Sequence, residues 1–287
     1  MRYGAAGAAS SKQLVRCQKR VKVVKRKRAA ARGPAHILSE VDIPSGSDQL
    51  LGAGNFNTPL TNRMQYNFTI IPTAATTCQA TISPARLSKY LIEAKGNLPL
   101  ALRLYFWNNS LCAAFYGPLQ LAEVAIRNAV IKPVLTRFGQ SWHQSQKFHG
   151  ILNKFQSKQL KDAFDKEQKQ HGHQTTSEHV TSALPFGFWV GLMSKSFDNQ
   201  LWPNGIHSSF PNAPKHFSRY DIHKEIDSIR SFRNDIMHYR SVFDKNPRAK
   251  IRQIVEITDY ICVDLSFAIS TANNVESVIS NKPSQNN

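Results

Sequence analysis

Apolar residues recur at helical spacing from Ser83 to about residue 272, and almost no segment alternates with the period of two that marks a strand. The pattern opens at Ser83-Pro84, where serine is a good helix N-cap and proline suits the first helical position. Leu87 and Leu91 follow one turn apart. The sequence therefore predicts an all-α fold.

Prolines and polar turns set the expected helix boundaries. Pro133 is expected to bend the helix that contains it, and Asp244-Lys245-Asn246 is expected to form the turn between the last two helices. The expected helices start at residue 83 and then cover about residues 99–115, 118–138, 151–170, 184–197, 220–242 and 247–272.

The first 63 residues differ from the rest of the chain in charge and composition. Residues 1–36 carry 11 Lys and Arg and no Asp or Glu, and the sequence up to Arg63 shows no sustained period. We expect residues 1–63 to form a disordered basic extension, either an arm for an anionic partner or a solvated tail. Met64 would also be a natural start, and residues 1–63 would then lie upstream of the true start.

The rest of the chain divides into three expected parts. Residues 64–82 are an ordered lead-in, residues 83–272 the helical domain, and residues 273–287 a polar, disordered tail. Residues 37–287 hold the other 26 Lys and Arg and all 19 Asp and Glu, a net charge of +7. This mildly basic body suits a polyanionic partner.

Several classes of protein are disfavoured by the composition. No run of about 18 apolar residues predicts a membrane-spanning helix, and the basic N-terminus has no apolar segment of a secretory signal. Four scattered cysteines without a C-x-x-C pair predict neither a disulfide framework nor a zinc site, and they fit a reducing cytoplasm. We expect no membrane association, no cofactor and no metal.

The segment SIRSFRNDIMHYR concentrates the chemistry of this chain. Arg233, Asn234 and His238 lie within about one and a half turns of a predicted helix. Arginine stays charged and offers a fork of donors that matches phosphate oxygens, whereas histidine can take up or release a proton near neutral pH. In RNA the 2′-hydroxyl is a nucleophile beside the phosphate, so a base and a cation suffice for cleavage without metal.

A helical wheel gives the three residues different positions. Asn234 and His238 share a face, whereas Arg233 lies in the apolar stripe, where a cation costs several kcal/mol unless it is paired or faces a cleft. Either Arg233 makes a buried ion pair and His238 is an ordinary surface histidine, or the two residues converge on one phosphate. The stripe comprises Ile222, Ile226, Ile229, Ile236 and Met237.

The motif segment resembles the R-N-x3-H form of the R-x4-6-H motif of the HEPN superfamily (higher eukaryotes and prokaryotes nucleotide-binding). Within that superfamily, four stretches are similar to the Abi-like (abortive infection) bacterial proteins and together cover about residues 82–270. Tyr239-Arg240 departs from the pattern, because relatives often have another histidine and an acidic residue there. The stretches are SPARLSKYLIEAKGNLPLALRLYFWN, PLQLAEVAIRNAV, LPFGFWVGLMS and IRSFRNDIMHYRSVF.

The resemblance implies a HEPN-like helical bundle with additional helices and a metal-independent endoribonuclease that leaves a cyclic phosphate. Arg233 would stabilise the transition-state phosphate, His238 would be the acid and base, and Asn234 would orient either group. A homodimer would form a composite site around RNA. The protein would be an abortive-infection or toxin-like effector in phage defence, with an antitoxin as a neutralising partner. The alternative is a HEPN-fold protein that binds RNA or a partner without cutting.

Four residues are candidates to support this site: Glu123, Arg127, Asn128 and Arg230. Glu123 and Arg127 stand four residues apart, and such a pair stabilises its own helix by a few tenths of a kcal/mol. Glu123 could instead hold Arg233, or Arg127 could join the RNA site. Arg230 flanks the face of Asn234 and His238.

Three aromatic residues, Phe186, Phe188 and Trp189, could stack on bases, but core packing is the favoured interpretation. The histidines of the polar loop at 171–179 match no strong metal-site spacing, and no cysteine lies near them. Neither group competes with the motif helix as a candidate site.

Overall fold

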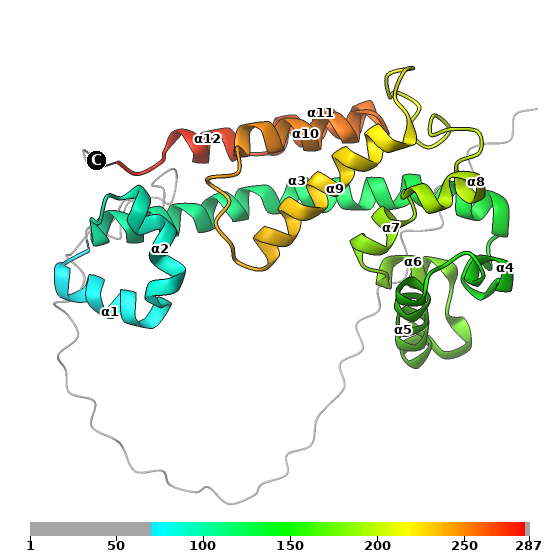
Figure 1. Ribbon diagram of the computed structural model, residues 1–287, viewed down its shortest axis with the longest axis horizontal. Helices are drawn as coiled ribbons and strands as arrows, with labels where there is room; N and C mark the ends of the chain where they lie inside the picture. Colours follow the sequence, from blue (N-terminus) through cyan, green and yellow to red (C-terminus); the bar gives the residue numbers. More distant parts are fainter. Residues whose placement is uncertain (1–69, 285–287) are drawn as a thin grey trace, which may run out of the picture. The chain divides into compact units, whose positions relative to one another are not determined.

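The computed structural model describes residues 70–284, and all regular structure in that range is helical (Figure 1). The predicted all-α class is confirmed. No helix within these residues combines the length and apolar character needed to cross a bilayer. The expected basic extension over residues 1–63 lies outside the described residues, as do the first six residues of the lead-in.

A single helix of 41 residues, α3 (Leu98–Phe138), runs through the fold and carries much of its core (Figure 1). The prediction of separate helices over 99–115 and 118–138 is wrong, because Pro118 lies inside the continuous helix. Proline removes one backbone hydrogen bond there, but buried apolar contacts on both sides favour the helix. The buried side chains that bridge the proline are Leu111, Phe115, Leu119, Ala122 and Ile126.

Two short helices precede α3 and pack on it. They are α1 (Pro72–Ile82), in the lead-in, and α2 (Pro84–Glu93). The predicted N-cap is confirmed, because the Ser83 side chain accepts a hydrogen bond from the Arg86 N–H. α3 begins in the same way, with the Asn97 side chain accepting from the Leu100 N–H.

After α3 the chain forms short helices and 3₁₀ turns. Residues 153 and 176 begin their helices with a capping box, in which side chains and backbone N–H groups bond reciprocally. The elements are η1 (Trp142–Gln144), α4 (Gln146–His149), α5 (Lys154–His171), η2 (Gly172–Gln174), α6 (Ser177–Ala183), α7 (Phe186–Gly191), η3 (Lys195–Phe197) and α8 (Asp198–Leu201).

The motif helix α9 (Arg219–Met237) packs on α3, α7 and α10 (Pro247–Asp259). The expected single helix over 247–272 is interrupted, and α11 (Val263–Ala272) follows as a separate helix. Asn212 explains the break. Its side chain donates to the Asp259 carbonyl (2.9 Å) and its N–H to the Tyr260 carbonyl (3.1 Å), so the connection before α9 occupies acceptors at the end of α10.

The prediction of a disordered tail over residues 273–287 is wrong for α12 (Val275–Ser280), which packs on α3 and α10. Val275 and Val278 are buried, and the Trp107 ring N–H donates to the Val278 carbonyl at 2.7 Å. Two valines three residues apart are enough to dock one turn of helix, although the segment is polar overall. Residues 285–287 lie outside the described range.

Candidate functional site

α9 ends five residues earlier than expected, because the backbone turns at Tyr239. Tyr239 has φ of 58°, its N–H donates to the Ile236 carbonyl (3.0 Å), and the Arg240 N–H donates to the Asp235 carbonyl (2.9 Å). These bonds form a Schellman cap, whose left-handed position is usually occupied by glycine. His238 is therefore the C-cap of α9 and not an interior helical residue.

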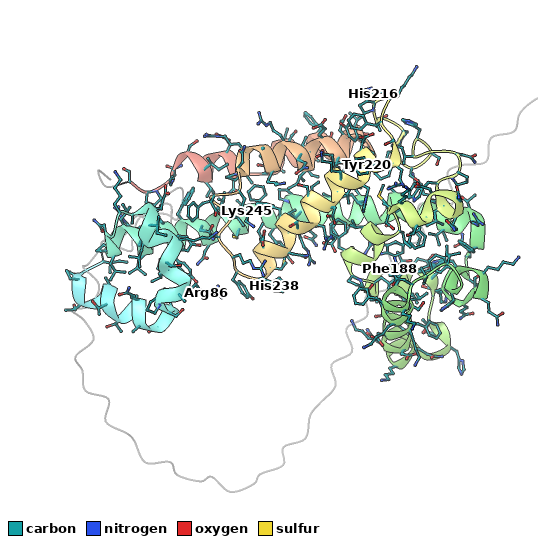
Figure 2. All side chains as sticks on the ribbon, viewed as in Figure 1. Arg86, Phe188, His216, Tyr220, His238 and Lys245 are labelled. Atoms are coloured by element: carbon teal, nitrogen blue, oxygen red, sulfur yellow. The ribbon has the colours of Figure 1, made fainter. Side chains whose placement is uncertain are left out.

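His238 is exposed at a cavity of 570 Å³ between α2 and the segment that follows α9 (Figure 2). We call it the basic pocket and define it by the titratable side chains Arg86, Lys89, His238, Arg240 and Lys245, together with Asp235. Its lining holds four permanent cations and one carboxylate, and Asp244, which lies outside the lining, pairs with Lys89. The pocket therefore keeps a net positive charge that suits an anionic ligand.

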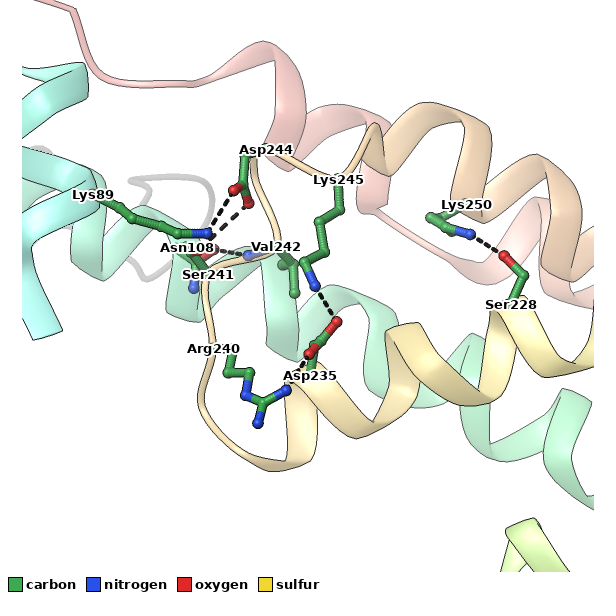
Figure 3. Close-up of polar contacts among 10 residues, drawn as sticks. All are labelled: Lys89, Asn108, Ser228, Asp235, Arg240, Ser241, Val242, Asp244, Lys245 and Lys250. Carbon is green, nitrogen blue, oxygen red and sulfur yellow. Dashed lines mark hydrogen bonds and ion pairs between the residues drawn. The ribbon is translucent and has the colours of Figure 1, made fainter.

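Three contacts hold the segment 238–246 against α2 and α3. Arg86 donates from Nη1 to the Tyr239 carbonyl (2.9 Å), and Lys89 Nζ bonds Asp244 Oδ2 (2.9 Å). The Val242 N–H donates to the side-chain oxygen of Asn108, which is buried on α3 (Figure 3). The segment after His238, which forms one wall of the basic pocket, is thus bonded to both α2 and α3.

Asp235 is a residue of this site that the sequence interpretation missed. Its side chain is only 8% exposed, and its carboxylate accepts hydrogen bonds from Arg240 Nη1 (3.1 Å) and from Lys245 Nζ (Figure 3). Burial by itself would raise the pKa of the carboxyl, but the bonds from Lys245 and Arg240 outweigh it and hold the pKa below its ordinary value. A helical wheel of α9 places Asp235 away from the apolar stripe. It is buried because the segment after α9 turns back and covers it with Arg240 and Lys245.

Arg233 is paired with Glu123 across α9 and α3. The distance from Arg233 Nε to Glu123 Oε2 is 3.2 Å, and the two side chains are 31% and 28% exposed. The structure therefore has the inter-helix pair and not the Glu123–Arg127 pair along α3. In residues 70–284 the guanidinium makes no other hydrogen bond, so its two terminal nitrogens remain available.

Asn234 and His238 lie one turn apart, and the His238 N–H donates to the Asn234 carbonyl at 2.9 Å. Asn234 is half-buried. Arg233 and Asn234 are not among the residues that line the basic pocket, whereas His238 is. Within one chain, the predicted catalytic residues thus share the end of α9 but not one cavity.

The other supporting candidates lie elsewhere. Arg127 and Asn128 line a separate cavity of 240 Å³ with Ser177 and Glu178 of α6. Arg230 bonds Asp227 within α9 at 2.8 Å. Within residues 70–284, Glu123 is the one supporting candidate whose side chain forms an ion pair with a predicted catalytic residue.

The aromatic residues of α7 belong to the core. Phe186 is 3% exposed, and Phe188 and Trp189 are completely buried. The Trp189 ring packs edge-on against Phe188 (5.3 Å) and Trp142 (5.9 Å). These rings have no free face for a base.

The expected polar loop at 171–179 is largely helical, and two of its histidines, at the end of α5 and in α6, have stacked rings. His171 and His179 are stacked with ring centroids 4.0 Å apart, and His171 Nε2 lies 3.4 Å from Glu167. Across residues 70–284, no group of three or more His, Cys, Asp or Glu side chains could hold a metal ion.

Comparisons of the chain with protein-family models, with curated proteins and with solved structures give no match. The class that the observations define is an all-α protein with a basic pocket at the C-terminal end of α9. Its function must be argued from the residues of that site.

Proposed function

We propose that this protein is a metal-independent endoribonuclease of the HEPN type, related to the Abi-like proteins, and that it acts as an abortive-infection or toxin-like effector. One observation carries the proposal. An exposed histidine ends α9 in a cavity rich in cations, and an arginine one turn earlier is oriented by a carboxylate on the neighbouring helix. This set supplies a proton acceptor, phosphate-binding charge and a directed guanidinium.

The proposed reaction needs only groups of this chain and the RNA. His238 takes the proton of a 2′-hydroxyl, and the resulting oxygen attacks the neighbouring phosphorus. The bond from phosphorus to the 5′ oxygen breaks, the 5′ oxygen receives the proton, and the other fragment keeps a 2′,3′-cyclic phosphate. Arg233 stabilises the charge that develops on the phosphate oxygens, and Asn234 orients the imidazole or the phosphate.

Glu123 is a positioning residue in this proposal. It bonds Nε of Arg233 and leaves the terminal nitrogens, which are the ones that suit bidentate phosphate binding. A guanidinium held in this way loses less rotamer entropy when it binds its ligand.

The proposal includes a homodimer with a composite site, RNA as the substrate and an antitoxin as a neutralising partner. Support for the composite site comes from the absence of Arg233 and Asn234 among the residues that line the basic pocket. A second copy that presents its own α9 end would bring the missing groups to one phosphate.

The test is cleavage of single-stranded RNA in EDTA by wild type and His238→Ala. Wild type should leave 2′,3′-cyclic phosphate ends, and His238→Ala should be about 10²- to 10⁴-fold slower with an unchanged circular dichroism spectrum. His216→Ala is the matched control, because His216 is exposed but lies before α9 (Figure 2). Cleavage that persists in His238→Ala, or a wild type that does not cut, would contradict the proposal.

The alternative, binding of RNA or a partner without cleavage, is favoured by the same Arg233–Glu123 pair, because the carboxylate neutralises the cation. Glu123→Gln separates the two functions. If Glu123 positions a catalytic arginine, the variant should cut more slowly. If the pair only neutralises Arg233, the variant should bind RNA more tightly, and neither protein should cut it.

A further inference from the structure

A second cavity, of 840 Å³, adjoins the basic pocket. It lies between α3 and the end of α9, and its lining is mostly apolar. We call it the tyrosine groove and define it by Tyr105, Cys112, Ala113 and Tyr116 of α3 with Met237 and Tyr239.

The groove and the pocket share a border. Arg86 and Tyr239 line both cavities, Met237 lines the groove, and His238 lines the pocket. Successive residues at the end of α9 therefore face an apolar environment and then a cationic one. A ligand that follows this border must have an apolar part and an anionic part next to each other.

Two rings of the groove have no partner ring. Tyr116 is 56% exposed and Tyr239 is 77% exposed, and neither makes a ring–ring contact within residues 70–284. Tyr239 also has an unfavourable backbone conformation, since tyrosine is disfavoured at φ of 58°. A tyrosine ring offers a stacking face to any nucleobase.

The groove also presents an amide. Asn109 is exposed and lines the groove, and its side chain makes no hydrogen bond in the described part of the chain. A free side-chain amide both donates and accepts, which is what the edge of an unpaired base requires.

We propose that the tyrosine groove binds an unpaired nucleobase of single-stranded RNA, so that the sugar and phosphate of that nucleotide lie at His238 in the basic pocket. Charge complementarity selects this occupant. The phosphates face Arg86, which makes no ion pair within residues 70–284, and the ends of Lys89 and Arg240, which stay 57% and 67% exposed although they pair with Asp244 and Asp235. The base removes two exposed tyrosine faces from water. A duplex is rejected, because its bases are already stacked and paired. The inference rests on the proposed function and assigns it a substrate class.

The test uses a fluorescent 2′-O-methyl oligonucleotide, which cannot be cleaved, so binding is measured apart from catalysis. Tyr116→Ala and Tyr239→Ala should each weaken its binding about tenfold. Tyr220→Ala is the matched control, because Tyr220 is also an exposed tyrosine but lies in the first turn of α9, at the other end of that helix (Figure 2). It should bind as wild type does, and an oligonucleotide with abasic positions should lose the dependence on both groove tyrosines.

The outcomes distinguish this inference from the proposed function. If wild type does not cut RNA but its binding depends on the groove tyrosines, the groove still binds a base and the proposed ribonuclease activity is wrong. Cleavage that depends on His238 but not on either groove tyrosine, with unchanged binding, would overturn the inference alone. A change in oligomeric state in Tyr116→Ala, with unchanged binding, would also overturn it and assign the groove to a second copy of this chain.

Discussion

Two groups of aromatic residues have opposite environments in this molecule. Around α4 and α7, the rings of Trp142, Phe148 and Trp189 are completely buried, and Trp142 packs edge-on against both of the others. Beside the end of α9, the rings of Tyr116 and Tyr239 are exposed and have no aromatic neighbour in residues 70–284. The first group contributes to stability, and the second is available to a ligand.

The difference shows that aromatic content by itself does not locate a binding surface. In the sequence, the segment PFGFW at 185–189 holds three aromatic residues, but all three are buried, and the helix that carries them packs on α3 and α9. The exposed rings are single tyrosines, Tyr116 on α3 and Tyr239 just after the end of α9. An aromatic ring is exposed to solvent where its residue lies at a helix end, as Tyr239 does, or on an uncovered face of a helix, as Tyr116 does.

The largest effect should come from emptying the buried group. Trp189→Ala should lower the free energy of unfolding by about 3–5 kcal/mol, because it removes a large ring from a closed core. Urea denaturation measures this loss. Tyr116→Ala is the control and should change stability by no more than about 0.5 kcal/mol. Equal losses of unfolding free energy in the two variants would show that the exposed tyrosine supports the fold as much as the buried tryptophan does.

Asp235 makes the end of α9 depend on a buried charge. Asp235→Asn should cost about 1–2 kcal/mol at neutral pH, because Lys245 and Arg240 lose their carboxylate but can regain water. The carboxyl pKa is lowered in the folded state, so the unfolded state binds the proton more readily. The stabilisation is thus present above the unfolded-state pKa and lost as pH falls through the folded-state pKa. Urea denaturation at a series of pH values should show this loss in wild type and not in the variant.

His143 gives the buried aromatic region its own pH response. Burial lowers the pKa of its imidazole, His149 adds to this effect, and Glu178 opposes it. A lowered histidine pKa means that the unfolded state takes up the proton first, so stability falls as pH drops through about 6.5. His143→Phe should remove this part of the pH dependence, measured by melting temperature between pH 7.5 and 5. An unchanged pH profile would assign the response to other groups.

The smallest effect should be a gain. Tyr239→Gly should raise stability by up to about 1 kcal/mol, because glycine adopts φ of 58° without steric cost. Thermal melts measure the gain, and the oligonucleotide assay should show weaker RNA binding in the same protein. Lower stability would mean that the Tyr239 ring supports the fold after all.

Local signals in the sequence predicted most of the helices but few of their ends. The Ser83-Pro84 start is encoded locally and appears as predicted. The end of α9 depends on Arg86 and Asn108, which hold the returning segment from α2 and α3. The break after α10 depends on Asn212 in another part of the chain. Such long-range contacts leave no mark in a local pattern.

The candidate site was predictable to a similar extent. Spacing identified Arg233, Asn234 and His238 as a set. The position of Arg233 in the apolar stripe called for a partner, and Glu123 is that partner. The burial of Asp235 and the apolar groove were not predictable. The segment that returns after α9 covers Asp235, and the groove forms between α3 and the end of α9. A helical wheel describes one helix and not the segment that covers it.

The hydrogen bond from Arg86 to position 239 does not depend on which side chain stands at 239. Arg86 donates to the backbone carbonyl of Tyr239, so a substitution at 239 that keeps the backbone turn also keeps the bond to α2. The side chain at 239 can then change while the other lining residues of both cavities keep their places. This position offers a place to retune ligand preference with the scaffold unchanged, which directed evolution of the chain could exploit.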